Sequence, residues 1–343
     1  MVIKVKVLQN IQVPTGNILI VSGYNGNLEL VSLGDYGKEH NIVADFMGLN
    51  RDIQQVKHTK LLPLEKKWVI TISTQYGCSM GCKFCDVPKV GPGINATFSD
   101  LVSQIQIGLS THTKVKYTER LNIHFARMGE PTFNFSVLEC ARYLDEYLGD
   151  FGKGIIKHNG VIHPVLSTMM PKANSLLPEF IDTWTKEIKN GKYGGDAGLQ
   201  LSINSTDNTE RNSMFNNKAM RLEDIAYLMK QMVKPIGRKY TLNFAVAEYE
   251  VDAQLLAHLF NPSDFLIKLT PMHKTNTAII NNINTSGDYT TLHPYKEIKE
   301  SCEKVGFDVL VFIASDEEDL GRITCGNAIL SGTMPECNYT IIK

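Results

Sequence analysis

Three cysteines lie close together in the stretch GCSMGCKFCDVP, which runs from residue 77 to residue 88. Cys78, Cys82 and Cys85 follow the spacing C-x3-C-x2-C. A structural zinc site needs four ligands, usually as two pairs, whereas the other four cysteines stand alone in the sequence. The spacing therefore favours a [4Fe–4S] cluster with three cysteine ligands and one iron open to a small ligand. A zinc site is the alternative.

The elements that must position these cysteines form an alternating pattern. From about Trp68 onward, short runs rich in Val, Ile, Leu and Phe alternate with longer amphipathic stretches. The runs predict buried parallel strands at 68–74, 121–127, 163–168, 198–204, 240–246, 265–271 and 307–313. Helices are expected over 98–110, capped by Thr97 or Ser99, and from Ser136, Leu222 and Tyr295.

This alternation predicts an α/β fold, a partial TIM-type (β/α)6 barrel with its chemistry at the carboxyl ends of the strands. Residues 1–65 differ, because apolar and polar residues alternate there around Gly and Asn turns, which predicts hairpins. We therefore expect a β-rich N-terminal appendage over 1–65 and a barrel over 66–343, whose C-terminal loop carries Cys325. The stretch 276–291 is expected to be a long surface loop.

Composition limits the function classes. Net charge is −1 over 343 residues, so no overall positive field predicts DNA binding, although a local basic groove would suffice for RNA. We expect no signal peptide, and no apolar run reaches the roughly 20 residues of a membrane span. Seven cysteines, an odd number, without a secretion signal predict a reduced, cytoplasmic protein.

Six segments stand in order along the chain, namely STQYGCSMGCKFC (73–85), RMGEPTFNF (127–135), HPVLSTMMP (163–171), LQLSINSTDNTERNSMF (199–215), IKLTPMHK (267–274) and ITCGNAILSG (323–332). In this order they resemble the motifs of the RlmN/Cfr group of radical S-adenosylmethionine (SAM) RNA methyltransferases, and the resemblance covers roughly residues 68–332.

The resemblance implies a [4Fe–4S] cluster and SAM as cofactors, and a flavodoxin- or ferredoxin-type electron donor. It also implies methylation of an adenine carbon, C2 or C8, in ribosomal or transfer RNA. The residues implied to line the SAM site are Gly129, Glu130, Ser167, Ser202, Ile203, Asn204 and His273. The two serines have a structural alternative, since they can satisfy strand-end backbone groups, and His273 stands where the group has Asn. Cys325 matches the cysteine that the group converts to S-methylcysteine.

The sequence departs from the group at three points. Thr71 occupies the position of the second catalytic cysteine, seven residues before Cys78. The acidic residue of the preceding hairpin has Glu29 as one candidate, while another register places Gln54 or Gln55 there. A β-rich stretch also stands where the group has a helical RNA-binding domain.

Two alternatives to methylation follow from these departures. One is a radical SAM enzyme that acts on another substrate without the two-cysteine relay, with Cys337 as the remaining thiol to consider. The other is a non-catalytic, cluster-binding relative that binds RNA.

Overall fold

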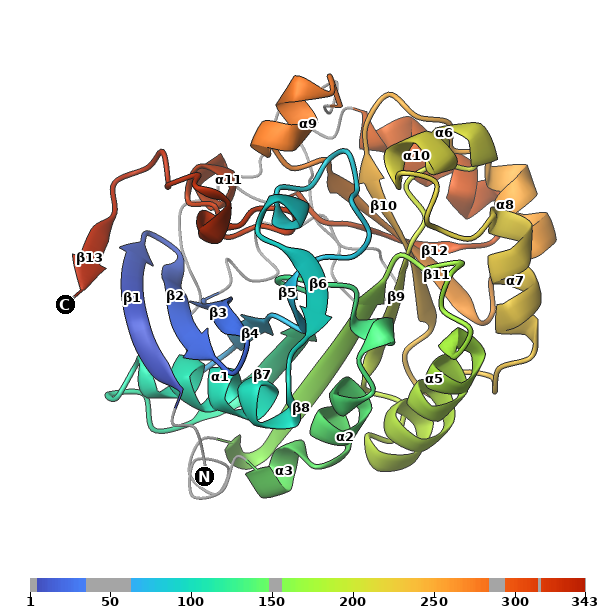
Figure 1. The fold of residues 1–343 in the computed structure, drawn as a ribbon. Coiled ribbons are helices and arrows are strands. Elements are labelled where there is room, and N and C mark those ends of the chain that lie inside the picture. Colours follow the sequence, from blue (N-terminus) through green and yellow to red (C-terminus); the bar gives the residue numbers. More distant parts are fainter. Residues whose placement is uncertain (1–4, 35–62, 148–155, 284–293, 314–315, 343) are drawn as a thin grey trace.

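The computed structural model describes residues 5–34, 63–147, 156–283, 294–313 and 316–342. Within this part, the main feature is one eleven-stranded sheet in the order β12-β11-β10-β9-β8-β7-β4-β3-β2-β1-β13 (Figure 1). Its strands are β1 (Lys6–Val13), β2 (Gly16–Gly23), β3 (Gly26–Leu33), β4 (Trp68–Ile72), β7 (Thr118–Phe125), β8 (Ile156–Thr168), β9 (Gly198–Ser202), β10 (Tyr240–Val246), β11 (Phe265–Pro271), β12 (Asp308–Val311) and β13 (Thr340–Ile342).

Strand β4 and strands β7 to β12 run parallel, and each of these seven corresponds to one strand expected from the sequence. Burial alternates along β10, where Leu242 and Phe244 join the apolar core outside the barrel and Asn243 between them is half-buried. The sheet does not close on itself, because β12 and β13 lie at its two ends. The predicted partial barrel is therefore confirmed, with seven parallel strands in place of six.

Helices connect the parallel strands. They are α1 (Phe98–Ser110), α2 (Ser136–Arg142), α3 (Leu144–Tyr147), α5 (Leu177–Thr183), α6 (Asn208–Met214), α7 (Leu222–Lys230), α8 (Ala253–Leu259), α9 (Asn276–Ile280), α10 (Tyr295–Lys304) and α11 (Asp316–Leu320). Of the two predicted caps of α1, Thr97 is the one used, since its side chain accepts a hydrogen bond from the Asp100 N–H at 3.1 Å.

The prediction of a surface loop over 276–291 was wrong at its beginning. The Thr275 hydroxyl accepts a hydrogen bond from the Ala278 N–H at 2.9 Å, and this cap starts α9. Residues 284–291 of that prediction lie outside the described residues.

The N-terminal hairpins continue the barrel sheet. β1, β2 and β3 pair antiparallel, and β3 pairs antiparallel with β4, where Val31 lies opposite Thr71. At the far edge, β13 pairs with β1 (Figure 1). The domain boundary at residue 65 stays a prediction. The described strands on both sides of it belong to one sheet.

The core lies between the outer face of the sheet and the helices. At Gly108 of α1, an added Cβ would lie 3.1 Å from the side chains of Leu30 on β3 and Ile70 on β4, so glycine permits close packing there. Cys140 and Cys302 are fully buried in this core. None of the described helices is long and apolar enough to cross a membrane.

Candidate cluster and cofactor site

The cysteine triplet lies on a loop framed by a two-stranded ribbon of β5 (Gln75–Gly77) and β6 (Pro92–Asn95). The Cys78 N–H donates to the Gly91 carbonyl at 3.1 Å. Gly77 has a φ of +78°, and an added Cβ there would lie 2.1 Å from the Gly91 oxygen. Only glycine therefore fits at the start of this loop, which we call the cluster loop (residues 78–89).

The three thiols are mostly withdrawn from water. Cys82 is 4% exposed, whereas Cys78 and Cys85 are half-buried. Burial raises the pKa of Cys78 to about 11 and raises the pKa of Cys82 and Cys85 as well. The negative charges of Cys85 and Cys78 raise the pKa of Cys82 further.

This donor set fits an iron–sulfur cluster in its chemistry. Three partly buried thiols act on one another electrostatically, and a cationic group would stabilise them as thiolates, which are the ligand form. Among the described residues, no group of three or more His, Cys, Asp or Glu side chains is arranged so that it could hold a single metal ion. A cubane cluster does not need such convergence, because each of its thiolates binds a different iron.

Glu130 follows β7 in a tight turn and is 1% exposed. Its carboxylate accepts hydrogen bonds from the Thr132 N–H at 3.1 Å and hydroxyl at 2.7 Å, the Thr168 hydroxyl at 2.7 Å and the Met169 N–H at 2.8 Å. Its own N–H donates to the side chain of Gln75 at 2.9 Å. Glu130 thus joins the ends of β7 and β8 to β5, the strand that leads into the cluster loop.

Gly129 permits this arrangement. Its φ is +97°, and an added Cβ would lie 2.6 Å from the Cβ of Gln75. Burial raises the pKa of Glu130, although the hydrogen bonds to its carboxylate act in the opposite direction. The charge of Glu130 also raises the pKa of Cys78, which places this carboxylate near the cysteine triplet.

Arg211, which is 1% exposed, hydrogen-bonds to the backbone at the end of β9. Its guanidinium donates to the carbonyl of Ser202 at 3.4 Å and to the carbonyl of Ile203. Asn204 has a φ of +62°, and its side-chain oxygen accepts a hydrogen bond from the Ala245 N–H at 2.9 Å. These three consecutive residues therefore have a fixed backbone at the carboxyl end of β9.

Ser167 lies at the end of the neighbouring strand and is half-buried, with Gln200 of β9 opposite. The hydroxyls of Ser167 and Ser202 make no hydrogen bond to another described residue. The structural alternative for the two serines, that they satisfy strand-end backbone groups, thus finds no such bond in the part of the chain that the structure describes.

His273 follows β11 and pairs with a carboxylate. Its Nδ1 lies 2.9 Å from Oδ1 of Asp319, and the same oxygen accepts a hydrogen bond from the Thr324 hydroxyl at 2.6 Å. Burial acts to lower the pKa of His273, but the charge of Asp319 outweighs it and the pKa is raised. Asp319 therefore links His273 to the residue that precedes Cys325.

Cys325 is the one cysteine of the chain that is exposed. The next residue, Gly326, has a φ of +88° and accepts a hydrogen bond at its carbonyl from the Asp86 N–H at 2.8 Å. An added Cβ on Gly326 would lie 3.4 Å from the Phe84 oxygen and 3.8 Å from the Cα of Cys85. The structure thus brings the loop carrying Cys325 against the cluster loop, although 240 residues separate Cys85 from Cys325.

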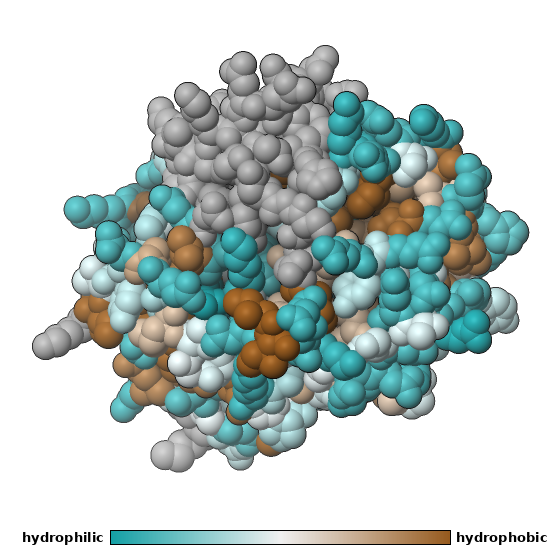
Figure 2. Space-filling view, turned by 90° about the horizontal axis from the view of Figure 1, so that it is seen from above, coloured by the Kyte–Doolittle hydropathy of each residue, from teal (hydrophilic) through white to brown (hydrophobic). Residues whose placement is uncertain are grey.

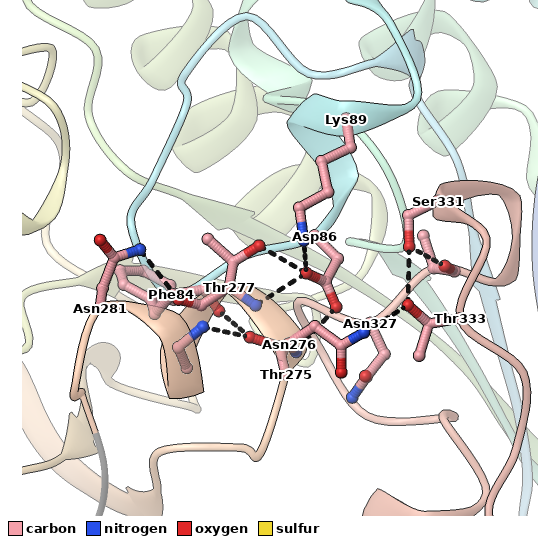
Figure 3. A network of polar contacts seen from close by, with 12 residues as sticks. Phe84, Asp86, Lys89, Thr275, Asn276, Thr277, Asn281, Asn327, Ser331 and Thr333 are labelled. Carbon is pink, nitrogen blue, oxygen red and sulfur yellow. Dashed lines mark hydrogen bonds and ion pairs between the residues drawn. The ribbon is translucent and has the colours of Figure 1, made fainter.

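Asp86 organises this contact and is fully buried (Figure 3). Its carboxylate accepts hydrogen bonds from the Asn276 N–H at 3.1 Å, the Thr277 N–H at 2.9 Å and the Lys89 ammonium at 2.7 Å. Asn276 in turn donates to the Thr333 hydroxyl at 3.0 Å. Asp86 therefore docks the start of α9 on the cluster loop, and α9 holds the chain beyond Cys325.

Thr71 and Cys337 are the two other residues named from the sequence. Thr71 is the fourth residue of β4, 8% exposed, with Val31 and His124 opposite it on the two neighbouring strands. Cys337 packs against an apolar cluster that includes Ile11 and Ile323, whereas the cysteine triplet packs in a different one.

Glu29, one candidate for the acidic residue of the preceding hairpin, lies on β3 of the N-terminal hairpins. Glu29 is fully buried and forms an ion pair with Arg127. Its charge is therefore neutralised inside the protein. Gln54 and Gln55, the alternatives in another register, lie outside the described residues.

Sequence reasoning missed several residues that shape the site, namely Gln75, Asp86, Arg127 and Arg211. Gln75, Arg127 and Arg211 lie inside motifs that were recognised, and Asp86 directly follows the motif that ends at Cys85. A charged side chain in or next to such a motif is a usable signal.

The chain matches known proteins in sequence and in structure, although no family model matches it. The dual-specificity RNA methyltransferase RlmN of Pseudomonas fluorescens is 25% identical over 265 residues, which cover 76% of this chain and 64% of that protein. A probable dual-specificity RNA methyltransferase RlmN of Pseudothermotoga lettingae is 27% identical over 210 residues, covering 60% of this chain and 54% of that protein.

These sequence matches support an RlmN/Cfr-like radical SAM protein, in line with the six motifs. The chain spans somewhat more than half the length of these curated relatives. The crystal structure of a radical SAM methyltransferase from Sphaerobacter thermophilus has the same fold, with a TM-score of 0.62 and 16% identity, over 94% of this chain and 81% of that one. The family expected from the six motifs and the partial barrel are thus both confirmed.

Proposed function

We propose that this RlmN/Cfr-like protein is a radical SAM enzyme that methylates an adenine carbon, C2 or C8, in ribosomal or transfer RNA. The observation that carries the proposal is the contact between two distant loops: Gly326, next to the exposed Cys325, is bonded to Asp86, next to Cys85. Methyl transfer through a cysteine requires a thiol that both SAM and the substrate can reach.

Cys78, Cys82 and Cys85 would hold a [4Fe–4S] cluster, and SAM would bind beside it. When bound, these groups supply a 5′-deoxyadenosyl radical after one electron arrives, here from a flavodoxin- or ferredoxin-type donor. Glu130 fixes the turn against which SAM would lie, because four hydrogen bonds lock its carboxylate. The other residues proposed to line the SAM site are Gly129, Ser167, Ser202, Ile203, Asn204 and His273.

Cys325 would accept a methyl group and carry it as S-methylcysteine. The sulfur would form a bond to the methyl carbon, the sulfonium bond of SAM would break, and the thiol proton would leave. Its exposure lets a substrate base approach, while the hydrogen bond of Asp86 to Gly326 fixes the adjacent backbone. This arrangement supports Cys325 as the catalytic residue.

Three exposed lysines support an RNA substrate. Lys218 donates to the carbonyl of Ser79 in the cluster loop, Lys83 donates to Ser213 at 3.0 Å, and the Lys172 N–H donates to the Lys218 carbonyl at 2.9 Å. Figure 2 looks onto the side of the molecule where Figure 1 places α9, and hydrophilic side chains cover much of it. Ammonium groups beside the site would contact phosphates, which supply most of the affinity of nucleic-acid binding.

A second candidate function is a radical SAM reaction on another substrate without the two-cysteine relay. It is favoured by Thr71, since a hydroxyl cannot form the disulfide that releases the product. Cys337, the remaining thiol to consider, packs against the apolar cluster that contains Ile323, two residues before Cys325.

The test is anaerobic reconstitution with iron and sulfide, followed by incubation with SAM, a reductant and RNA. We expect 5′-deoxyadenosine and an RNA methyl group traced by mass spectrometry to adenine. 5′-Deoxyadenosine without any methylated RNA would shift the conclusion to the second candidate. The absence of both products from protein with a full cluster would overturn both candidates.

A further inference from the structure

A buried ion pair joins the N-terminal hairpins to the turn after β7. Glu29 on β3 and Arg127 are 0% and 1% exposed at their side chains. Nε of Arg127 donates to Oε1 of Glu29 at 2.9 Å, and a second guanidinium nitrogen contacts the same oxygen. Leaving water costs each charge several kcal/mol, so a buried pair of this kind contributes less to stability than its contacts suggest.

The same two side chains hold the backbone of the loop that carries Cys325. Arg127 donates to the carbonyl of Thr324 at 3.1 Å and to the carbonyl of Arg322 at 2.8 Å. Glu29 accepts a hydrogen bond from the Leu330 N–H at 3.0 Å. The ion pair is thus hydrogen-bonded to the loop backbone before Cys325, at Arg322 and Thr324, and after it, at Leu330.

The loop needs such external support because its own backbone is strained. Arg322 has a φ of +57°, a left-handed conformation that costs a residue with a side chain free energy. Charge-assisted hydrogen bonds from a buried guanidinium are strong and directional. They can therefore fix the carbonyl next to Cys325 in a way that apolar packing cannot.

We infer that Glu29 and Arg127 are positioning residues that hold the loop 322–330, and with it Cys325, in place over the cluster loop. Neither side chain contacts substrate, since both are buried. The role of Cys325 as a methyl carrier rests on the proposed function, whereas the anchoring of the loop does not depend on it.

Hydrogen exchange read by mass spectrometry on the intact chain tests the anchoring. The double variant Glu29→Met/Arg127→Leu replaces the pair by apolar side chains of similar length, a change that buried ion pairs often tolerate. We expect exchange in peptides covering 322–330 to become at least about tenfold faster, while exchange in the parallel strands is unchanged. The control Lys66→Leu/Glu119→Met removes an exposed ion pair elsewhere and should leave these peptides unchanged.

A folded double variant with wild-type exchange over 322–330 would overturn the inference. If the double variant does not fold, Glu29→Gln decides the question, because it keeps the side-chain shape and removes only the charge. It should speed exchange over 322–330 by a smaller factor, and unchanged exchange there would again overturn the inference.

A kinetic measurement separates positioning from general destabilisation. In Glu29→Gln we expect methylation of Cys325 to slow by about tenfold at saturating SAM, with an unchanged affinity for SAM. A lower SAM affinity at an unchanged maximal rate would contradict positioning. Wild-type protein that never methylates Cys325 would overturn the proposed function and leave the exchange result valid.

Discussion

A hydrogen bond joins the residue after Cys85 to the residue after Cys325: the Asp86 N–H donates to the Gly326 carbonyl at 2.8 Å. This bond fixes the distance between the backbones of two cysteines to which different roles are assigned, one as an iron ligand and the other as a methyl carrier. Reaction between groups held on separate loops depends on such fixation, because displacements of about 1 Å can cost orders of magnitude in rate.

The cysteine triplet should carry iron. Protein purified without oxygen should contain about four irons per chain, and replacement of Cys78, Cys82 or Cys85 by Ala should abolish this content, measured by metal analysis. Cys140→Ala, a change in the apolar core, is the control and should keep the iron. Stoichiometric zinc in place of iron would show that the cluster assignment is wrong.

Glu130→Ala should weaken SAM binding by at least about tenfold without loss of iron. The substitution leaves the buried N–H group of Thr132 and the partly buried N–H group of Met169 without their acceptor, and an unsatisfied buried group costs about 1–3 kcal/mol. Calorimetry on the reconstituted protein measures the affinity, with exposed Glu139→Ala as the control. An affinity for SAM equal to the wild type's would remove this turn from the cofactor site.

Thr71 should limit turnover after Cys325 has been methylated. A hydroxyl is a poor nucleophile towards methylcysteine and forms no disulfide, so we expect methylated Cys325 but little or no product release by the two-cysteine route. Peptide mass spectrometry detects the methyl group on Cys325, and RNA methylation assays measure the release of methylated RNA. Thr71→Cys should raise RNA methylation, whereas the matched control Thr71→Ser should not.

Cys325→Ala supplies the counter-test for this mechanism. Full RNA methylation by that variant, together with wild-type protein that never carries a methyl group on Cys325, would favour the second candidate function.

His163 should make the fold less stable in acid. Its Nδ1 lies 3.2 Å from Asp196 and its Nε2 lies 3.2 Å from Arg238, with Arg120 and His124 also nearby. Burial lowers the pKa of His163 to about 4, and the charges of Arg238 and Arg120 act in the same direction. The unfolded chain, with an imidazole pKa of about 6.5, therefore binds more protons between these values, and stability is lost as the pH falls through this window.

Urea unfolding at several pH values between about 7.5 and 4.5 measures this slope. His163→Gln should make the slope shallower, and part of it should remain because burial also lowers the pKa of His124. His258→Gln, on an exposed helix surface, controls for the loss of one histidine. A slope in His163→Gln equal to that of the wild type would contradict the prediction.

Local patterns predicted the strands and several helix starts well. The runs 240–246 and 265–271 coincide with β10 and β11, because apolar residues between turn signals report burial directly. The cap at Thr97 follows from short-range chemistry in the same way. The helix start at Leu222 was also predicted, but its N–H donates to the side chain of the distant Asn208 at 2.9 Å and its N-cap residue makes no side-chain cap.

What the sequence did not reveal depends on pairing across long distances. Glu29 and Arg127 are separated by 98 residues, and nothing local distinguishes a buried acidic side chain from one that faces a substrate. The antiparallel pairing of β3 with β4 likewise depends on the return of a distant segment, so residues 1–65 were expected to form an appendage. The site residues were named through a resemblance, whereas Asp86 and Arg211 act through contacts that only a fold can bring about.

The hydrogen bond between Glu29 and the Leu330 N–H spans 301 residues of sequence, and this separation orders events during biosynthesis. Chains emerge from the ribosome N-terminus first, so the cysteine triplet and much of the barrel are made before the loop that will lie against them. During that interval the three thiols are made but the loop that will lie against them is not. Under the proposed function, iron delivered at this stage would reach the cysteine triplet before the Cys325 loop docks on the cluster loop.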